Sequence, residues 1–435
     1  MTNILKSYQE ENDELITNIL KNRFLKAYKG DKFPGSENLS GLELIIDQKC
    51  NLACKYCYYD KYGVEYFPKG TEVKSTLLSN AKIIVKWLID NKLFPNVTLF
   101  SGDILYRDIG IELIEIFYEF IELGGKLMIP TNASFISDDK QFKKICNILD
   151  KYPIGISLSI EGKCCEHSRP YKGKQIENRD DAYYDRVFKF AKKYGYGFHP
   201  MIHSSNIKDW KKNIDWYFDM FDKYDIAPYR LYLLEVRNED WSNQELIIYS
   251  EFMEYLINTT FKRICNSDKN EMINYIFKLK GFNTLSSPFF RIGRGIGCSI
   301  QSMIALRLGD MTIVPCHRLA YKWFEIGKLK LPEFKVYDTK KPELMIGIYS
   351  STTTNFPKCD NCAINSLCSS GCLGHNFETS KDLFYTNFNV CRLMHVKLKA
   401  QLESFKKIDI LNDILMRLDN EKTTQIIEFC KIHNI

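Results

Sequence analysis

The stretch that decides the fold is CNLACKYCYY, residues 50–59, which follows the apolar run LELIID at residues 42–47. The apolar run has the length and composition of a buried strand, so Cys50, Cys54 and Cys57 fall in a loop at the carboxyl end of that strand. Three thiolates so close together can each hold one iron of a cubane cluster and leave the fourth iron without a protein ligand. Because an open iron is reactive, we expect chemistry at this loop.

A zinc knuckle or a set of redox-active thiols is the alternative interpretation of these cysteines. Zinc prefers four ligands in tetrahedral geometry, and no fourth Cys or His lies near them in the sequence. The spacing and the position after a strand therefore favour an iron–sulfur cluster.

From residue 42 to about residue 262, short β-rich runs alternate with amphipathic helical runs in six units. Such a series implies parallel strands joined by right-handed crossovers. Six units predict an α/β fold, a partial (β/α)6 TIM-like barrel, with its site at the carboxyl ends of the strands. The predicted strands are 42–47, 97–101, 126–132, 154–160, 197–204 and 229–236, and the predicted helices are 76–92, 109–124, 138–151, 181–194, 207–224 and 244–263.

A second group of cysteines follows the barrel pattern, in a loop-rich stretch whose composition suits a small domain held by metal clusters. These thiols are too many for one tetrahedral site, so they predict two sites, with a zinc ribbon on four of them as the alternative. The cysteines are Cys298, Cys316, Cys359, Cys362, Cys368, Cys372 and Cys391. The expected segments are an N-terminal helical cap (1–41), the barrel (42–263), a connector (264–297), the cluster domain (298–395) and C-terminal helices (396–435).

Composition excludes several classes of protein. The chain has 435 residues with 45% hydrophobic content, which is typical of a globular protein. Its 60 basic and 54 acidic residues are scattered, so no stripe for nucleic acid stands out. There is no apolar run long enough for a membrane span and no signal peptide, so we expect a cytoplasmic protein in which the 15 cysteines do not form disulfides and the two cysteine groups bind metal.

The CxxxCxxC motif after the first strand of a β/α array resembles the radical S-adenosylmethionine (radical SAM) superfamily, and CNLACKYCYY looks like its peptide-modifying branch. The resemblance implies that the open iron binds SAM through its amino and carboxylate groups. It also implies that one electron from the cluster cleaves SAM to a 5′-deoxyadenosyl radical, which removes a hydrogen atom from the substrate.

The resemblance further points to residues around SAM. SGDIL follows the second strand where the family has GGEP, TNA ends the third strand where the family has TNG, and ISLSIEG resembles the LS(M/I)DG stretch of the fourth strand. The alternatives are a turn-forming Asn132 and a solvated Arg169 in a loop. The cofactor-binding residues implied are Tyr56, Ser101, Gly102, Asp103, Asn132, Ser159 and Arg169.

The second cysteine group resembles the SPASM domain, which carries two auxiliary [4Fe–4S] clusters in maturases of peptides and proteins. The family's interleaved ligation implies an inner cluster that is one cysteine short, with an open or non-cysteine coordination site that could accept a substrate thiolate. With the SAM-binding cluster, the expected total is three. The implied ligands are Cys359, Cys362, Cys368 and Cys391 for the outer cluster, and Cys298, Cys316 and Cys372 for the inner one.

His317 follows Cys316 directly. Sulfatase-maturing relatives have a catalytic aspartate at this position, which counts against sulfatase maturation here. We take His317 as the candidate catalytic base, with a structural hydrogen-bonding role as the alternative.

The leading hypothesis is radical modification of a ribosomally made precursor peptide, by a thioether or carbon–carbon cross-link or by epimerisation. The alternatives are a sulfatase-maturing enzyme and a non-catalytic iron–sulfur or zinc-binding protein. The expected partners are the precursor peptide and a low-potential electron donor such as a ferredoxin or flavodoxin. The forty residues before the barrel leave no room for a full leader-binding domain. Leader recognition would therefore use the helical termini or a separate leader-binding protein, or the substrate would have no leader.

Overall fold

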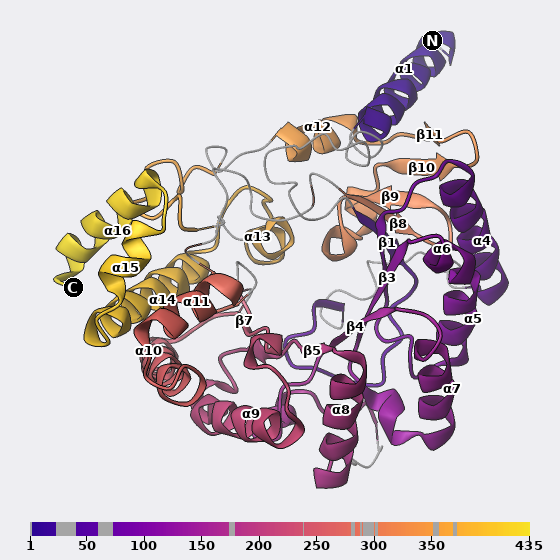
Figure 1. Cartoon of the computed structure of the whole chain (residues 1–435). Coiled ribbons are helices and arrows are strands. Elements are labelled where there is room, and N and C mark those ends of the chain that lie inside the picture. Colours follow the sequence, from indigo (N-terminus) through magenta and orange to yellow (C-terminus); the bar gives the residue numbers. More distant parts are fainter. Residues whose placement is uncertain are drawn as a thin grey trace.

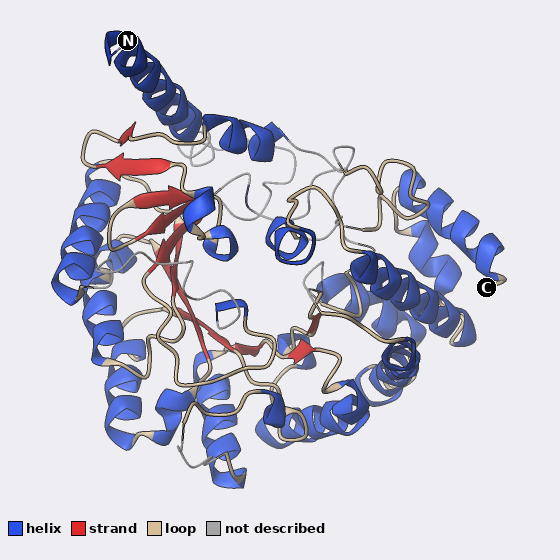
Figure 2. Ribbon diagram, turned by 180° about the vertical axis from the view of Figure 1, so that it is seen from behind, coloured by secondary structure: helices blue, strands red, loops and turns tan. Residues whose placement is uncertain are grey.

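Parallel strands with helices outside them form the centre of the molecule (Figures 1 and 2). Five strands pair in parallel in chain order, as the β/α rhythm predicted. These strands are β1 (Gly41–Ile45), β2 (Asn96–Phe100), β3 (Lys126–Thr131), β4 (Gly155–Leu158) and β5 (Gly197–Phe198). The computed structural model describes residues 2–22, 41–59, 73–173, 179–237, 239–279, 283–287, 289, 300, 303–350, 356–368 and 372–435.

Helices connect successive strands and cover the outer face of the sheet (Figure 2). Their apolar faces and one face of each strand form the largest core, to which Leu42 and Leu44 of β1 contribute. These helices are α4 (Lys74–Asp90), α5 (Asp108–Ile116), α6 (Tyr118–Glu122), α7 (Asp139–Leu149), α8 (Asp181–Tyr194), α9 (Trp210–Tyr224) and α10 (Asn243–Thr259). The predicted α/β partial barrel is therefore confirmed.

The fifth and sixth units are less regular than the sequence predicted. The predicted strand 197–204 divides at Pro200 into β5 and β6 (Met201–Ile202), because proline cannot donate a ladder hydrogen bond. The predicted strand 229–236 is reduced to β7 (Leu234–Glu235), which pairs in parallel with β6. A 3₁₀ turn that begins at Pro228 occupies the start of that predicted strand.

The sheet continues beyond β1 into a stretch that composition predicted as loop-rich. Strand β8 pairs in parallel with β1, and three more strands follow in antiparallel order. Arg307 at the end of β8 is buried and pairs with Asp310 and Glu325 at 2.7 Å, which anchors this extension. The strands are β8 (Ile304–Arg307), β9 (Thr312–Val314), β10 (Gly327–Lys330) and β11 (Lys335–Tyr337).

The N-terminal helix α1 (Thr2–Leu20) packs on β11 at the edge of the sheet (Figure 1). The Thr17 hydroxyl accepts the Val336 N–H at 2.8 Å, and the Asp13 carboxylate accepts the Thr339 N–H at 2.8 Å. Side chains of helix α1 therefore accept hydrogen bonds from backbone N–H groups at an edge strand, which could otherwise pair with another chain.

The C-terminal helices pack back on the barrel through α14, which lies against α10. Lys397 of α14 and Glu235 of β7 are both fully buried, and their charged groups are 2.9 Å apart. The hydroxyls of Tyr249 and Thr284 donate to the same carboxylate at 2.6 and 2.7 Å. This buried ion pair fixes the position of α14 on the sixth strand, and removal of one partner would leave a buried charge. The remaining helices are α11 (Lys269–Leu279), α12 (Pro342–Ser350), α13 (Leu373–Ser380), α14 (Phe388–Lys407), α15 (Leu411–Met416) and α16 (Asn420–His433).

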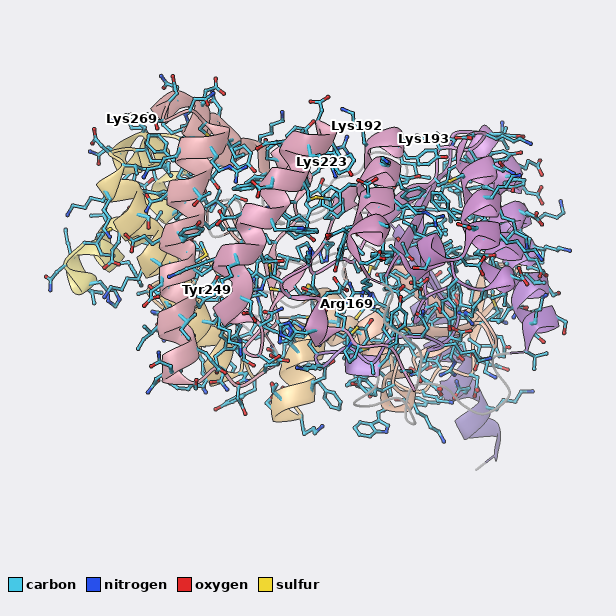
Figure 3. The ribbon with its side chains drawn as sticks, turned by 90° about the horizontal axis from the view of Figure 1, so that it is seen from below. Arg169, Lys192, Lys193, Lys223, Tyr249 and Lys269 are labelled. Carbon is cyan, nitrogen blue, oxygen red and sulfur yellow. The ribbon has the colours of Figure 1, made fainter. Side chains whose placement is uncertain are left out.

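The outer surface carries locally paired charges. Lys192, Lys193 and Lys223 at the ends of α8 and α9 each pair with an aspartate, and in Figure 3 Arg169 lies away from that end of the helices. Among the described helices, none is both long and apolar enough to cross a membrane.

Candidate active site

The loop with Cys50, Cys54 and Cys57 follows β1, at the carboxyl edge of the parallel strands. Residues 51–55 pair in an antiparallel manner with residues 168–172 of the loop after β4. Backbone hydrogen bonds of 2.8 to 3.0 Å join the two segments. The loop is therefore held in place by the protein itself.

The surroundings of these thiols suit a metal cluster. Burial raises the pKa of Cys50 to about 12, and the neighbouring charges of Asp103, Cys54 and Cys57 also raise it, against the Leu52 N–H. Burial also raises the pKa of Cys54, and the Arg169 guanidinium opposes that rise. Buried thiols of this kind become thiolates when a bound metal supplies positive charge, so the donor set fits a cluster.

Asn132 joins the cysteine loop to the end of β3. Its side-chain amide lies 3.6 Å from the Cys50 Sγ and donates to the Asn51 Oδ1 at 2.9 Å. Its own Oδ1 accepts the Ser134 N–H at 2.9 Å. Asn132 therefore forms a turn, as its alternative interpretation predicted, and its side chain also contacts the cysteine loop.

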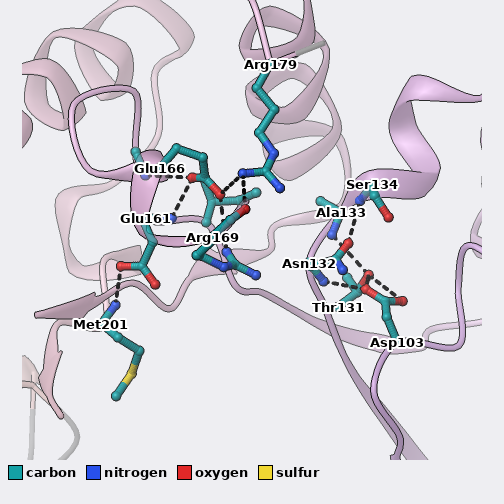
Figure 4. A network of polar contacts seen from close by, with 12 residues as sticks. Asp103, Thr131, Asn132, Ala133, Ser134, Glu161, Glu166, Arg169, Arg179 and Met201 are labelled. Atoms are coloured by element: carbon teal, nitrogen blue, oxygen red, sulfur yellow. Dashed lines mark hydrogen bonds and ion pairs between the residues drawn. The ribbon is translucent and has the colours of Figure 1, made fainter. Parts of the chain in front are cut away.

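The Asp103 carboxylate is buried and bonded within the protein. It accepts hydrogen bonds from the Asn132 N–H at 2.6 Å and the Thr131 hydroxyl at 2.9 Å (Figure 4), and from the Leu105 N–H at 3.0 Å. With these donors around it, the Asp103 side chain positions the Asn132 turn.

The SGDIL backbone lies against the cysteine loop. The N–H groups of Gly102 and Asp103 donate to the carbonyls of Asp47 and Lys49, and a Cβ atom at Gly102 would lie 2.5 Å from the Lys49 carbonyl. Only glycine fits this close approach. The Ser101 hydroxyl donates to Asp47 at 2.6 Å. Since the carbonyls of Asp103, Ile104 and Leu105 already accept hydrogen bonds from Arg107 and Gln141, those of Ser101 and Gly102 are the ones that SGDIL can offer to an amino group.

Arg169 is buried, with 3% of its surface exposed, so it is not the solvated loop arginine of the alternative interpretation. Its nearest carboxylate, Glu166, is 3.6 Å away and hydrogen-bonds Arg179 at 2.8 Å (Figure 4). Nε and Nη1 of Arg169 have no hydrogen-bond acceptor among the described residues. A buried guanidinium with unpaired donors beside Cys54 fits the carboxylate of a ligand.

Glu161 is a site residue that the sequence analysis missed. Its buried carboxylate accepts a hydrogen bond from the Met201 N–H at 2.8 Å (Figure 4) and another from the Tyr56 hydroxyl. Burial raises its pKa to about 8, against the Arg169 charge. Glu161 thus joins the cysteine loop to the strands beside it, while the half-buried Ser159 is tied to β3 through its N–H. The sequence feature that could have indicated Glu161 is an acidic residue at the end of the apolar run of the fourth strand.

His317 lies against β1 and β2. Its Nδ1 is 3.0 Å from the Glu43 carboxylate, which also accepts the His317 N–H at 2.9 Å. The Phe100 ring stacks on the imidazole, with centroids 3.9 Å apart. The sequence analysis also missed Glu43. The feature that could have indicated it is a charged residue inside the apolar strand LELIID.

Four C-terminal cysteines from two segments come together. Burial raises the pKa of Cys391 to about 11, and the neighbouring thiols of Cys368, Cys359 and Cys362 contribute. These are the four ligands that the family resemblance implies for the outer cluster.

The predicted inner ligands are less completely described. Cys316 is buried, and Cys372 lies at the N-cap of α13 beside the Arg318 guanidinium. Cys298 lies outside the described residues. No disulfide joins the cysteines that the structure describes, and no three Cys, His, Asp or Glu side chains among the described residues are close enough to hold a single metal ion. The ligand sets therefore stay predictions.

The fold is that of a partial parallel β/α barrel with a three-cysteine loop after its first strand and a cysteine-rich C-terminal segment. The structure is similar to that of hexahistidine-tagged anSMEcpe with bound AdoMet, with a TM-score of 0.56 and 15% sequence identity over 86% of this chain and 99% of that chain. This likeness establishes the fold, which is the one that the cysteine motifs led us to expect.

Two weaker structural matches are to Streptococcus suis SuiB. The free protein has a TM-score of 0.47 and 18% identity over 81% of this chain and 77% of that chain. SuiB bound to precursor peptide SuiA has a TM-score of 0.47 and 17% identity over 81% and 76%. No protein-family model matches the sequence, and a search of curated protein sequences finds no match.

Proposed function

We propose that this chain is a radical SAM enzyme whose SAM-binding cluster is held by Cys50, Cys54 and Cys57. The observation that carries the proposal is the cysteine loop fixed at the carboxyl edge of the barrel, beside Arg169 with its unpaired buried donors. The fold likeness to anSMEcpe, which was solved with AdoMet bound, supports it.

The two charged groups of the SAM methionine end have suitable partners in this site. Arg169 would bind the carboxylate, the Ser101 and Gly102 carbonyls would accept from the amino group, and Asn132 and Ser159 line the same edge. Tyr56 and Glu161 would hold the cysteine loop against the strands. When bound, the cluster and SAM would supply the one-electron chemistry that removes a hydrogen atom from a substrate.

His317 is proposed as the proton acceptor for the modified substrate, with Glu43 as the residue that orients it. Glu43 accepts from the His317 backbone and from Nδ1, which leaves Nε2 as the acceptor nitrogen of the neutral ring. Stacking on Phe100 fixes the plane of the imidazole. Because Glu43 orients the ring, it is a positioning residue and His317 is the base.

The proposed substrate is a ribosomally made precursor peptide, and the proposed product is a thioether or carbon–carbon cross-link or an epimer. The support is the SPASM-like cysteine pattern and the nearness of Cys359, Cys362 and Cys368 to Cys391, which raises the pKa of that thiol. The inner cluster, with Cys298, Cys316 and Cys372, would keep one position for a substrate group. A ferredoxin or flavodoxin would supply electrons.

Reductive cleavage of SAM tests the proposal. Anaerobic reconstitution should give about three [4Fe–4S] clusters per chain, and SAM with a strong reductant should release 5′-deoxyadenosine. Cys54→Ala should abolish release. Cys146→Ala, which removes a half-buried thiol on the outer helix α7, should leave it unchanged. A single zinc ion per chain, or release that persists in Cys54→Ala, would refute the proposal.

Mass spectrometry of the substrate tests the peptide. A cross-linked precursor peptide should lose two hydrogen atoms, whereas a sulfatase peptide should remain unchanged. Oxidation of a sulfatase peptide instead would move the assignment to sulfatase maturation.

A further inference from the structure

His203 is a buried histidine at the active-site edge that the proposed function does not use. It follows β6, at the same carboxyl edge as the cysteine loop, and its side chain is inaccessible to solvent. Its ring lies against Tyr56, with centroids 5.1 Å apart, and Tyr56 lies between two of the predicted cluster ligands. His203 is therefore part of the wall around the cysteine loop.

The hydrogen bonds of His203 define its tautomer. The Ser205 N–H donates to Nδ1 at 3.3 Å, and the Ser205 hydroxyl is 3.1 Å from the same nitrogen. Nδ1 is therefore an acceptor, and the ring proton is on Nε2. Burial lowers the pKa of His203 to about 4, and Lys55 and His167 add to the effect, so the ring is neutral.

The Nε2–H group has no hydrogen-bond partner among the described residues, although it is buried. Because Nδ1 faces the turn at Ser205, Nε2 points away from that turn. Buried N–H groups in proteins are nearly always paired, so an unpaired one at a binding site indicates a ligand or an ordered water.

The chemistry of the Nε2–H donor indicates which part of SAM it would bind. The charged ends of SAM are matched by Arg169 and by the cluster itself, whereas a neutral imidazole N–H suits an uncharged acceptor. On the basis of the proposed function, we propose that Nε2–H of His203 donates a hydrogen bond to the adenosine moiety of bound SAM, at a ribose oxygen or a ring nitrogen.

Two substitutions separate the two ring nitrogens. His203→Asn can keep an acceptor near Nδ1 for Ser205 but has no atom at the Nε2 position. His203→Gln can place an amide N–H near Nε2 and gives up the Nδ1 acceptor. Ser205→Ala is the matched control, because it removes the hydroxyl contact on the Nδ1 side only.

The experiment is equilibrium dialysis of labelled SAM with the anaerobically reconstituted, unreduced protein, with iron content measured for each variant. His203→Asn should raise the Kd for SAM about tenfold, whereas His203→Gln and Ser205→Ala should stay within roughly threefold of the parent protein. With 2′-deoxy or 3′-deoxy SAM, the tenfold difference should disappear for the analogue that lacks the acceptor, and its persistence with both would assign the acceptor to the ribose ring oxygen or to adenine.

An unchanged Kd in His203→Asn at full iron content would overturn this inference and assign Nε2–H to an ordered water. An increase in Ser205→Ala as large as that in His203→Asn would overturn it as well, because the turn and not the donor would be responsible. A parent protein that takes up iron and does not bind SAM would instead refute the proposed function.

Discussion

The two cysteine regions differ in what holds them together. The first lies in one short loop, paired through its backbone with residues 168–172 and contacted by Asn132. The second draws its thiols from separate segments, and its stretch 356–368 consists of turns without helix or strand. The barrel loop is therefore formed by hydrogen bonds within the protein, whereas the C-terminal region would owe its structure to the clusters that it binds.

Removal of iron should have the largest effect, and should affect only one of the two regions. With a chelator, amide hydrogen exchange in residues 356–368 should rise by roughly 100-fold or more, since little else orders those turns. Exchange in residues 41–59 should change by less than about threefold. Mass spectrometry of peptic peptides measures both regions in one sample, and equal deprotection of both would remove the distinction between them.

Arg169 tests whether the first region is a binding site and not only a rigid loop. Arg169→Gln should raise the Kd for SAM roughly 10- to 100-fold, because a charge-assisted hydrogen bond to the carboxylate is lost. The same change at Arg186, which pairs with Asp139 on the outer surface, should have no effect on the Kd. Equal affinity in the two variants would contradict the role given to Arg169.

Glu43 lies where the two regions meet, and its substitution should have the smallest effect. Gln at this position offers one carbonyl oxygen in place of two carboxylate oxygens, so the Nδ1–H of His317 is no longer fixed. The yield of modified peptide per SAM cleaved should fall about tenfold, while cleavage without substrate stays unchanged. Glu112→Gln on the outer surface is the control. A parallel loss of cleavage and modification would mean that Glu43 serves the fold alone.

The order of the β/α units could be predicted because each strand and helix is encoded locally by apolar periodicity. The division of the fifth strand could be predicted only in part. Pro200 shows where the ladder of hydrogen bonds is interrupted, but the bounds of β7 depend on which of its residues pair with β6. The pairing of β8 with β1 joins residues more than two hundred positions apart, and three- or four-residue strands give no periodic signal.

The site shows the same division. The cysteine loop could be located because it follows a predicted strand. Its pairing with residues 168–172, the burial of Arg169 and the side-chain contacts of Glu43 and Glu161 could not be derived, because each requires the three-dimensional arrangement of several strands.

The central claim is that Cys50, Cys54 and Cys57 hold a cluster with an open iron that binds SAM. Electron paramagnetic resonance of the reduced protein, with and without SAM, tests it most directly. SAM should alter the signal of the parent protein. A variant with all three cysteines changed to Ala should keep about two-thirds of the iron and show no response to SAM. A response of equal size in that variant would contradict the account.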